Sequence, residues 1–369
     1  MKFELFYKKW YNKPVNKKVM VAMSGGVDSS VAALLLKKQG YEVVGVTMCL
    51  GIKDIEDSPY RCCGTQSIED ARSVCTQLKI KHYVMDFSKQ LEEDVINPFV
   101  ADYSVGKTPN PCIECNRHIK FGSLFEKAKS MGFEFLATGH FAAIENLKGS
   151  HFLKKPKDKM KDQTYFLYQI KAECLKSVIF PLCDLTKDEV RGIARDWKLA
   201  VADKPQSQDV CFIPDKNYHK FIEKKIKSAK PGKIVDKKGS TLGNHKGICF
   251  YTVGQRAGFE LKKQSPSQKP LYVVSINLEK NELVVGEKKD LGADGLIASD
   301  INLFTEDFSG EIFAKIRYAH KDAKCSVVKT GDKIRVKFDT LQQSITPGQS
   351  VVLYRDGFVL GGGKIESVI

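Results

Sequence analysis

Residues 19–48, VMVAMSGGVDSSVAALLLKKQGYEVVGVTM, limit the possible folds of this chain more than any other stretch. Five apolar residues, Val19 to Met23, predict a short buried strand, and an apolar helix is expected from Val31 to Lys38. A second strand is expected from Val43 to Met48. Strand, glycine loop, helix and strand in this order form the unit that directs backbone N–H groups and a helix N-terminus at an anion.

The loop at 24–30, SGGVDSS, carries residue types that suit phosphate binding. Gly25 and Gly26 let the backbone approach a phosphate closely. Three serines are expected to supply hydroxyl donors and to cap the helix: Ser24, Ser29 and Ser30. The loop is neither a Walker A motif, because no Lys precedes the serine pair, nor GxGxxG, and a ligand-free turn is the alternative. It resembles SGGxDS, the pyrophosphate-binding signature of the PP-loop ATP pyrophosphatases.

Length, charge and cysteine content narrow the class of protein. At 369 residues the chain is long enough for two or three domains. Its formal net charge of +15 fits a polyanionic partner, although a lysine-rich composition alone would give the same charge. Eleven cysteines without a secretion signal favour reduced thiols, metal ligands or redox catalysis in a reducing compartment. No apolar run approaches the length of a membrane span. The first 18 residues lack the apolar core and cleavage site of a signal peptide and are poorer in Arg and Ser than a usual transit peptide, so we expect a cytoplasmic protein.

Strands and helices are expected to alternate through the first part of the chain. Apolar residues at helical spacing from Ile68 to Leu78 predict a helix, His82–Phe87 predicts a strand, and Leu91–Val100 predicts another helical segment. A strand should end at Gly139-His140, and Thr186 with Glu189 predicts a capped helix. The alternation predicts a mostly parallel sheet with helices on both faces and ligands beyond the carboxyl ends of its strands.

From Pro231 the helical spacing gives way to short alternating strands with turn residues between them. Strands of a small closed β domain are expected at Ile312–Tyr318, Lys333–Phe338 and Val351–Ile369. We therefore predict an α/β protein with an N-terminal parallel-sheet domain, a small mixed, mainly β domain and a C-terminal β-barrel-like domain. The expected bounds are an N-terminal arm at 1–17, the PP-loop catalytic domain at 18–227, the central domain at 228–295 and the barrel at 296–369.

Three cysteines stand apart from the others. Cys112 and Cys115 form a CxxC within 105–122, a segment so rich in Pro, Gly and polar residues that we expect a loop, followed by a helix at 123–130. Cys211 lies 96 residues beyond Cys115, and no second CxxC completes a zinc ribbon. The three thiols could be a redox pair with a third thiol that takes no part in the chemistry, a three-thiolate metal or iron–sulfur site, or structural thiols. The structural alternative suits Cys115 less well, because a thiol on such a loop would pack against little. Core positions suit five further cysteines: Cys75, Cys174, Cys183, Cys249 and Cys325.

Seven motifs occur together and in order: SGGVDSS at 24–30, TPNPCIECNRHIKFG at 108–122, ATGH at 137–140, KDQTYFL at 161–167, SQDVCFI at 207–213, YTVGQRAG at 251–258 and ITPGQSVVLY at 345–354. With them the chain resembles the tRNA-specific 2-thiouridylases over residues 17–369. These enzymes place sulfur on C2 of the wobble uridine of certain tRNAs. The resemblance implies a fold of the adenine nucleotide alpha hydrolase type, with ATP and Mg²⁺ as cofactors.

The resemblance also implies a role for each matching residue. The ATP site would comprise Ala22, Met23, Ser24, Gly25, Gly26, Val27, Asp28 and Ser29, with Met48 and Gly139 lining the pocket and Asp28 holding Mg²⁺. Cys115 would be the nucleophile, and Cys211 would carry a persulfide and pair transiently with Cys115. Asn110, Pro111 and Cys112 would lie beside the target base, and tRNA contacts would come from His140, Lys161, Asp162, Gln163, Arg317, Tyr318 and Gln342.

The expected partners are the tRNAs for Lys, Glu and Gln, and a sulfur donor such as a cysteine desulfurase or a sulfur-relay protein. Family members commonly have Asp where this chain has Cys112. That difference leaves open a [4Fe–4S] cluster held by Cys112, Cys115 and Cys211, and it leaves the roles of Cys49, Cys62 and Cys63 undefined.

Two other classes of protein compete with a tRNA-thiolating enzyme. A PP-loop ligase for a small molecule would explain residues 24–30, but it would not explain the cysteines, the lysines between 154 and 161 or the β domains. A non-catalytic RNA- or metal-binding protein would not need Asp28 and both loop glycines. In the favoured mechanism ATP converts the C2 oxygen into an adenylate, and loop N–H groups with Mg²⁺ stabilise the pyrophosphate released.

Overall fold

The computed structural model describes residues 17–51, 65–205, 210–213, 217–226, 229–256, 260–261 and 270–369. Residues 1–16 of the predicted arm, and Cys62 and Cys63, lie outside this part of the chain. The structure divides into two compact units. The first contains the residues up to Asp94 together with Ile113–Pro214, and the second contains Val95–Cys112 together with Asp215–Ile369.

A parallel sheet forms the centre of the first unit, in the strand order β3-β2-β1-β4-β7. Its strands are β1 (Lys18–Ala22), β2 (Glu42–Cys49), β3 (Lys81–Asp86), β4 (Phe135–Thr138) and β7 (Val178–Ile179). The predicted parallel sheet is confirmed. Because β2 and β3 extend the sheet on one side of β1 and β4 on the other, the strand order reverses between β1 and β4. Ligands bind at such a switch point in open α/β sheets.

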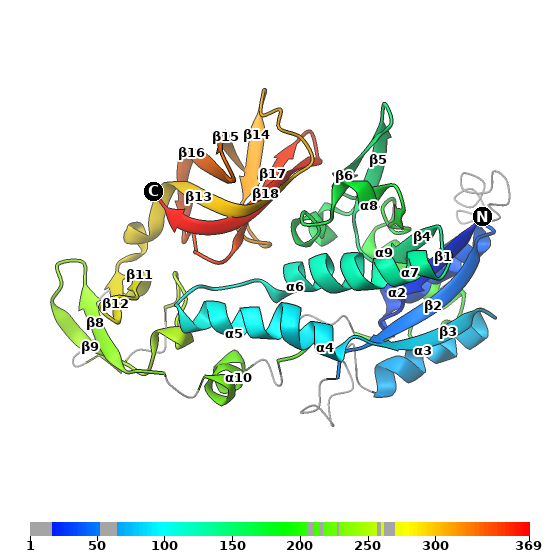
Figure 1. Cartoon of the computed structure of the whole chain (residues 1–369), viewed down its shortest axis with the longest axis horizontal. Coiled ribbons are helices and arrows are strands. Elements are labelled where there is room, and N and C mark those ends of the chain that lie inside the picture. Colours follow the sequence, from blue (N-terminus) through cyan, green and yellow to red (C-terminus); the bar gives the residue numbers. More distant parts are fainter. Residues whose placement is uncertain are drawn as a thin grey trace. The chain divides into compact units, whose positions relative to one another are not determined.

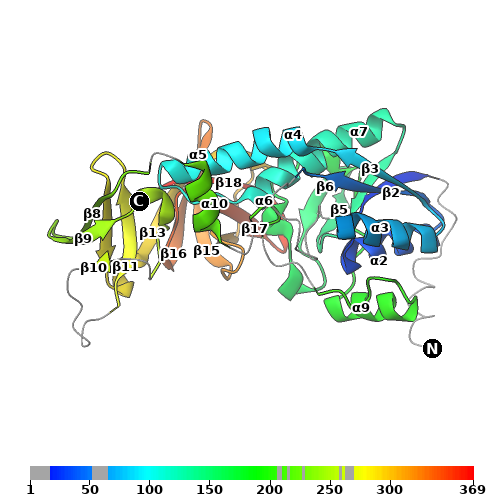
Figure 2. The same cartoon turned by 90° about the horizontal axis from the view of Figure 1, so that it is seen from below.

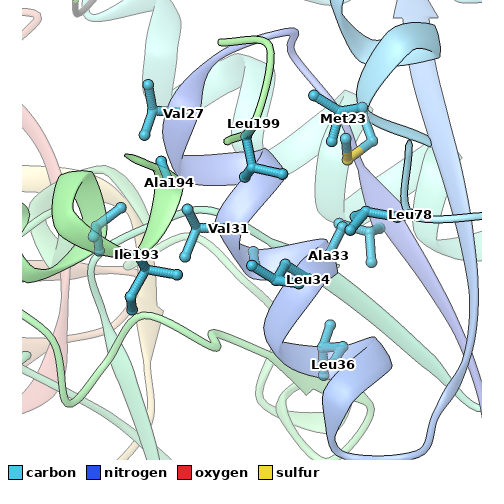
Figure 3. Packing of buried hydrophobic residues seen from close by; sticks show 14 of the residues in the cluster. Met23, Val27, Val31, Ala33, Leu34, Leu36, Leu78, Ile193, Ala194 and Leu199 are labelled. Atoms are coloured by element: carbon cyan, nitrogen blue, oxygen red, sulfur yellow. The ribbon is translucent and has the colours of Figure 1, made fainter. Parts of the chain in front are cut away.

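Helices cover both faces of this sheet. Figure 2 shows α2 (Val27–Lys38), α3 (Thr65–Gln77) and α9 (Lys187–Asp196) on one side and α7 (Leu124–Ser130) on the other. Val31 and Leu34 of α2 lie among buried side chains that include Ile193 and Ala194 of α9 (Figure 3). The predicted capping box of α9 is confirmed, since Thr186 accepts from the Glu189 N–H and Glu189 accepts from the Thr186 N–H. The buried contact and the cap together fix the start of α9 beside α2.

The prediction of a loop over residues 105–122 is wrong from residue 111 onward. Helix α6 (Pro111–Glu114) continues into the π-helical segment η2 (Cys115–Ser123) and then into α7. Pro111 suits the first helical position because its φ is preset and its missing N–H would have no helical partner. Asn110 Oδ1 accepts from the Cys112 N–H at 3.2 Å, as an N-cap side chain does. The Asn-Pro pair is therefore a helix start signal, which the composition of the segment concealed.

The remaining elements of the first unit are short. A second helical stretch comprises α4 (Ser88–Leu91) and the π-helical η1 (Glu92–Ile96), within which the first unit ends at Asp94. The stretch continues as α5 (Asn97–Ser104) of the second unit. After β4 come the hairpin β5 (Ala143–Leu147) and β6 (Ser150–Lys154), the 3₁₀ turns η3 (Lys159–Lys161) and η4 (Thr164–Phe166), and α8 (Ala172–Leu175). Tyr165, Leu167 and Tyr168 are buried in the core.

A mixed sheet forms the first part of the second unit, in the order β10-β9-β8-β12-β11. Its strands are β8 (Gly232–Asp236), β9 (Thr241–His245), β10 (Glu260–Leu261), β11 (Tyr272–Asn277) and β12 (Glu282–Gly286). The pair β8–β12 is parallel and the other pairs are antiparallel. Helix α10 (Tyr218–Lys225) precedes this sheet, with the 3₁₀ turns η6 (Ile248–Phe250) and η7 (Lys288–Leu291) within and after it.

A closed antiparallel barrel forms the C-terminal part of the second unit (Figure 1). Its strands are β13 (Gly292–Leu303), β14 (Ile312–Lys315), β15 (Ala323–Thr330), β16 (Lys333–Gln343), β17 (Ser350–Arg355) and β18 (Phe358–Val368). The pairing of β13 with β18 closes it. The predicted closed β domain is confirmed, although the stretch from Val351 is two strands separated by the Asp356-Gly357 turn. Within the described part of the chain, no helix is long and apolar enough to span a membrane.

Candidate functional site

The glycine loop lies at the switch point of the parallel sheet. Ala22, the last residue of β1, is in register with Thr138, the last residue of β4, so the loop and Gly139 leave the sheet side by side. Gly25 has φ +67°, and a Cβ there would lie 2.3 Å from the Ser67 carbonyl oxygen of α3. A Cβ on Gly139 would lie 2.6 Å from the Ser29 backbone nitrogen. Both glycines are therefore required for the backbone approaches that place the start of α2 at the sheet edge.

The start of α2 differs from the prediction that serines cap it. The N-cap is Gly26, and no side chain in the described structure caps the helix. The Ser29 and Ser30 hydroxyls donate backward to the Gly26 carbonyl at 3.1 Å and 2.9 Å, and the Ser24 N–H donates to Ser29 Oγ at 3.2 Å. These bonds fix the shape of the loop and leave the first-turn N–H groups without a side-chain acceptor, as an anion-binding helix start requires.

Two lysines that the motif analysis missed contact this loop, Lys187, which is buried, and Lys204, which is half-buried. The Lys187 ammonium, on the first residue of α9, donates to Asp28 Oδ1, and the Lys187 side chain is 11% exposed. The Lys204 ammonium donates to the Gly25 carbonyl at 3.1 Å and to Asp70 Oδ2 of α3 at 2.5 Å. A sequence signal existed for Lys187, because a lysine in the first turn of a capped helix opposes the helix dipole. Asp28, predicted to hold Mg²⁺, is therefore paired with a lysine.

The ATGH and KDQ motifs meet beside the loop. Gln163 Oε1 accepts from the Phe141 N–H at 2.8 Å, and the Gln163 N–H donates to the Phe141 carbonyl at 2.9 Å. His140 Nδ1 lies 2.7 Å from Thr138 Oγ1. Burial, with the Lys120 charge as a smaller cause, holds the pKa of His140 well below its usual range, so the ring is neutral at physiological pH.

The other predicted residues of the first unit differ in their exposure. Asp162 is 5% exposed and accepts from both the Thr164 N–H and hydroxyl, so its carboxylate is used in an internal turn. Lys161 ends η3 and is half-buried, and Met48 is half-buried next to the last residue of β2.

The three candidate reactive cysteines occupy different environments. Cys112 is exposed, Cys211 is half-buried, and Cys115 is 9% exposed at the first position of η2. The expectation that Cys115 packs against little is wrong, since its segment is helical and its neighbour Asn116 is buried and donates to the Phe166 carbonyl at 2.9 Å. Among the described residues, no group of three or more His, Cys, Asp or Glu side chains is placed to hold a metal ion. The cluster alternative thus lacks a preformed ligand set there.

The remaining cysteines follow the prediction of core positions with one exception. Cys75, Cys174, Cys249 and Cys325 are buried, while Cys183 is half-buried and Cys49, at the end of β2, is also half-buried. Burial raises the pKa of Cys75 and of Cys325 to about 12. None of the nine described cysteines is in a disulfide. The deeply buried thiols are therefore protonated and chemically inert at physiological pH.

Two motifs of the second unit, YTVGQRAG and ITPGQSVVLY, contact Thr108 at the start of a third motif. We call this contact the motif junction (Thr108, Thr252, Val253, Arg317, Ser344–Gln349). The Thr108 N–H donates to the Pro347 carbonyl at 2.9 Å, and Gln349 Nε2 donates to the Thr108 carbonyl at 2.8 Å. The Thr108 hydroxyl donates to Thr252 Oγ1 at 3.1 Å. The junction thereby fixes the segment that leads into Asn110, Pro111 and Cys112.

Arg317 holds the motif junction together from the barrel side. Its Nη2 donates to the Val253 carbonyl at 3.1 Å, to the Ser344 carbonyl at 2.9 Å and to the Thr346 hydroxyl. Tyr318 is 37% exposed, and Gln342 Nε2 donates to the Thr340 carbonyl at 2.8 Å. Of the three predicted tRNA contacts on the barrel, Arg317 is thus engaged internally, whereas Tyr318 is accessible.

The fold and site define a class of protein: a nucleotide-binding parallel-sheet domain joined to two β domains. Family models match in this order, with the tRNA methyl transferase HUP domain at 17–215, the tRNA methyl transferase PRC-barrel domain at 219–287 and the aminomethyltransferase β-barrel domain at 293–365. The curated protein "tRNA-specific 2-thiouridylase MnmA 1" of Syntrophus aciditrophicus is 51% identical over 355 residues, covering 96% of this chain and 94% of the relative.

Two further relatives carry the same printed name, "tRNA-specific 2-thiouridylase MnmA". The Clostridium botulinum protein is 46% identical over 360 residues, covering 96% of this chain and 99% of the relative. The Carboxydothermus hydrogenoformans protein is 47% identical over 360 residues, covering 95% and 98%. The chain belongs to the tRNA-specific 2-thiouridylase family, and the predicted resemblance is confirmed.

Proposed function

We propose that this chain is an ATP-dependent tRNA-uridine 2-sulfurtransferase that thiolates the wobble uridine of tRNA. The observation that carries the proposal is the uncapped start of α2 at the sheet switch point, with two lysines against the loop, in a chain of this family. A phosphate-binding loop alone would fit a small-molecule ligase equally well. Family membership over nearly the whole length, including both β domains, favours tRNA as the acceptor.

The first step is the activation of the uridine. The C2 oxygen attacks the α-phosphorus of ATP, the bond from that phosphorus to the bridging oxygen breaks, and pyrophosphate leaves. The developing negative charge would be stabilised by the loop N–H groups from Gly25 onward and by the positive end of α2. Asp28 offers the hard oxygen ligand that Mg²⁺ prefers, and Mg²⁺ when bound would neutralise the phosphate charge. AMP can then serve as the leaving group.

The second step transfers sulfur. The terminal sulfur of a persulfide on Cys211 attacks C2, and AMP leaves with the former C2 oxygen. The Cys115 thiolate then attacks Cys211 Sγ, which forms a Cys115–Cys211 disulfide and leaves the sulfur on C2. An external thiol reductant reopens the disulfide. The persulfide itself must come from a donor, for which a cysteine desulfurase or a sulfur-relay protein is the chemical class required, in a reducing compartment such as the cytoplasm.

We favour this route over a [4Fe–4S] cluster held by Cys112, Cys115 and Cys211. The described residues offer no preformed metal-ligand group, and Cys112 is exposed whereas Cys115 is buried. Anaerobically purified wild type should contain no stoichiometric iron, and Cys112→Ala should still thiolate tRNA. Loss of both iron and activity in Cys112→Ala would replace the persulfide route with a cluster mechanism.

Single-turnover thiolation tests the two-cysteine chemistry. Cys115→Ser and Cys211→Ser should each abolish thiolated product while retaining tRNA binding in a gel shift at physiological salt. Cys49→Ser, at the half-buried end of β2, is the matched control and should retain product formation. Product from either of the first two variants would overturn the sulfur-transfer scheme. Failure of the wild type to bind tRNA would favour the small-molecule ligase instead.

A further inference from the structure

The two lysines at the glycine loop are unusual for their burial. The side chains of Lys187 and Lys204 are 11% and 14% exposed, and their carboxylate partners Asp28 and Asp70 are 26% and 19% exposed. Buried ion pairs gain little net stability, because the loss of hydration of both charges offsets their attraction. Two such pairs that converge from distant parts of the sequence on one phosphate-binding loop therefore call for a role other than stability.

We propose that Lys187 and Lys204 are ligands of the pyrophosphate moiety, held on Asp28 and Asp70 when the site is empty and transferred to phosphate oxygens when it is filled. This inference rests on the proposed function and adds two residues to its nucleotide site. Each lysine exchanges one anionic partner for another. The loop thus gains two positive charges for the ligand without exposing a buried unpaired ammonium in the empty state.

The positions of the two ammonium groups support this exchange. Lys204 Nζ already donates to the Gly25 carbonyl, so it lies at hydrogen-bond distance from the loop backbone itself. The Lys187 backbone is fixed, since its N–H donates to Asp158 Oδ2 at 2.8 Å at the capped start of α9. Its flexible four-carbon side chain can still redirect the ammonium while the backbone stays in place. Rotation about the side-chain bonds of either lysine can therefore turn its ammonium from the carboxylate towards an anion on the loop.

The pair between Lys187 and Asp28 has a consequence for the metal. Asp28 is the residue we assign to Mg²⁺, and the same carboxylate accepts from Lys187 in the empty site. Lys187 and Mg²⁺ therefore compete for Asp28, whereas Lys204 is paired with Asp70 and does not. Removal of Lys187 should weaken pyrophosphate binding and at the same time lower the Mg²⁺ concentration needed to occupy Asp28. Removal of Lys204 should weaken pyrophosphate binding alone.

Calorimetric titration of pyrophosphate into the full-length protein, without tRNA, tests the inference. Wild type should bind, and Lys187→Met and Lys204→Met should each lose about tenfold or more in affinity, the size expected for a charge-assisted hydrogen bond. Lys157→Met is the matched control, because Lys157 pairs with Glu189 in the first turn of α9 and its side chain is 44% exposed. It should bind as wild type does.

Two further variants separate ligand binding from structural support. Asp70→Asn removes the competing carboxylate of Lys204 and should bind pyrophosphate at least as tightly as wild type. Lys187→Arg keeps the charge and should retain most of the affinity, which serves if Lys187→Met does not fold. A second titration with Mg²⁺ should give half-saturation at a lower concentration in Lys187→Met and at an unchanged concentration in Lys204→Met.

The outcomes distinguish this inference from the proposed function. If wild type does not bind pyrophosphate, the proposed nucleotide loop itself is wrong. If wild type binds and Lys187→Met and Lys204→Met bind equally well, the lysines are structural and the inference is overturned while the function stands. A fall in affinity for Asp70→Asn as large as that for Lys204→Met would likewise assign the pair to structural support.

Discussion

The nucleotide loop and the motif junction are both built where segments distant in sequence meet, but they are held together differently. At the loop, Lys187 of α9 pairs with Asp28, and Lys204, which donates to the Gly25 carbonyl, pairs with Asp70 of α3. At the junction, Arg317 donates to two backbone carbonyls and one hydroxyl. In an ion pair the lysine can exchange its carboxylate for a phosphate and the carboxylate can exchange its lysine for a metal ion, whereas the backbone carbonyls that bind Arg317 carry no charge for such an exchange.

This difference separates a ligand site from a scaffold. The loop satisfies its buried charges with partners that an incoming anion or cation can replace. The junction satisfies its buried polar groups within the unit and leaves Thr108 fixed by Pro347, Gln349 and Thr252. Motif residues in this family therefore serve two purposes, and sequence alone did not separate them.

The largest effect is expected for Gly139→Ala, which tests whether the close backbone approach at Gly139 positions the glycine loop. Its new Cβ would lie 2.6 Å from the Ser29 nitrogen and 2.7 Å from the Asp28 carbonyl carbon, so the start of α2 must move. We expect AMP formation to fall by roughly 100-fold, as misplacement of a reacting group by about 1 Å typically costs. Rapid-quench measurement of AMP with tRNA present gives the value.

Gly192→Ala is the matched control for that substitution. Gly192 lies within α9 with no heavy atom within 4 Å of the added Cβ. We expect unchanged AMP formation and a free energy of unfolding raised by about 0.5–1 kcal/mol from the better helix propensity of Ala. Equal AMP rates in the two variants would show that the close approach at Gly139 does not position the loop.

Arg317→Met tests the contribution of Arg317 to the stability of the motif junction. The substitution removes the Arg317 donor from the Val253 carbonyl and from the Thr346 hydroxyl, and it removes one of two donors from the Ser344 carbonyl, which still accepts from the Thr346 hydroxyl. We therefore expect a loss of roughly 1–3 kcal/mol in the free energy of unfolding. Pyrophosphate binding should be unchanged. Urea unfolding measures the loss, with Arg335→Met on the exposed face of β16 as the control. Weaker tRNA binding with unchanged stability would restore the family-based role of Arg317 as a tRNA contact.

The sequence predicted the parallel sheet, the glycine loop and the capped helix at 187 because each depends on residues adjacent in the chain. The apolar run Val19–Met23 is typical of a buried strand. Thr186 and Glu189 form a capping box within four consecutive residues. The strands β13 and β15 were not predicted, because glycines and aspartates typical of turns interrupt the sequence of β13, and only one residue of β15 is buried. Their register is set by pairing with β16, which no local pattern encodes.

The candidate site was predicted in part for the same reason. The motif identified the residues of the loop, but the partners of Asp28 and Gly25 lie 159 and 179 residues away, at Lys187 and Lys204. The Pro, Gly and polar residues of 105–122 predict a loop, although helix α6 begins at Pro111. The Asn110-Pro111 pair is a local start signal for this helix, and the composition of the segment conceals it. Local chemistry therefore indicates which residues bind, and only tertiary contacts show what holds them.

The pH dependence of stability tests whether His140 is neutral in the folded protein, in contrast to the charged lysines at the glycine loop. Burial holds the pKa of His140 below that of an unfolded chain, so the unfolded state binds more protons as the pH falls below about 6.5. The stability contributed by neutral His140 is complete above that pH and is lost below it, by at most about 1.4 kcal/mol per pH unit for one proton. Between about pH 7.5 and about pH 5.5, the free energy of unfolding of His140→Asn should decrease less steeply with falling pH than that of wild type. Parallel curves would show that His140 does not titrate differently on folding.

The smallest effect is expected for the exposed ion pair between Lys157 and Glu189 of α9. Lys157 Nζ lies 2.9 Å from Glu189 Oε1, and the two side chains are 44% and 37% exposed, compared with 11% and 26% for Lys187 and Asp28. Lys157→Met should change the free energy of unfolding by about 0.5 kcal/mol or less, and that difference should shrink at high salt. Lys187→Met, which leaves Asp28 without its cation, should cost more and respond less to salt. Urea unfolding of both variants at low and high salt compares two ion pairs that each have one partner in the first turn of α9. If both lysines behaved alike, burial would not distinguish the loop pair from an ordinary surface pair, and exchange with a ligand would lose its physical basis.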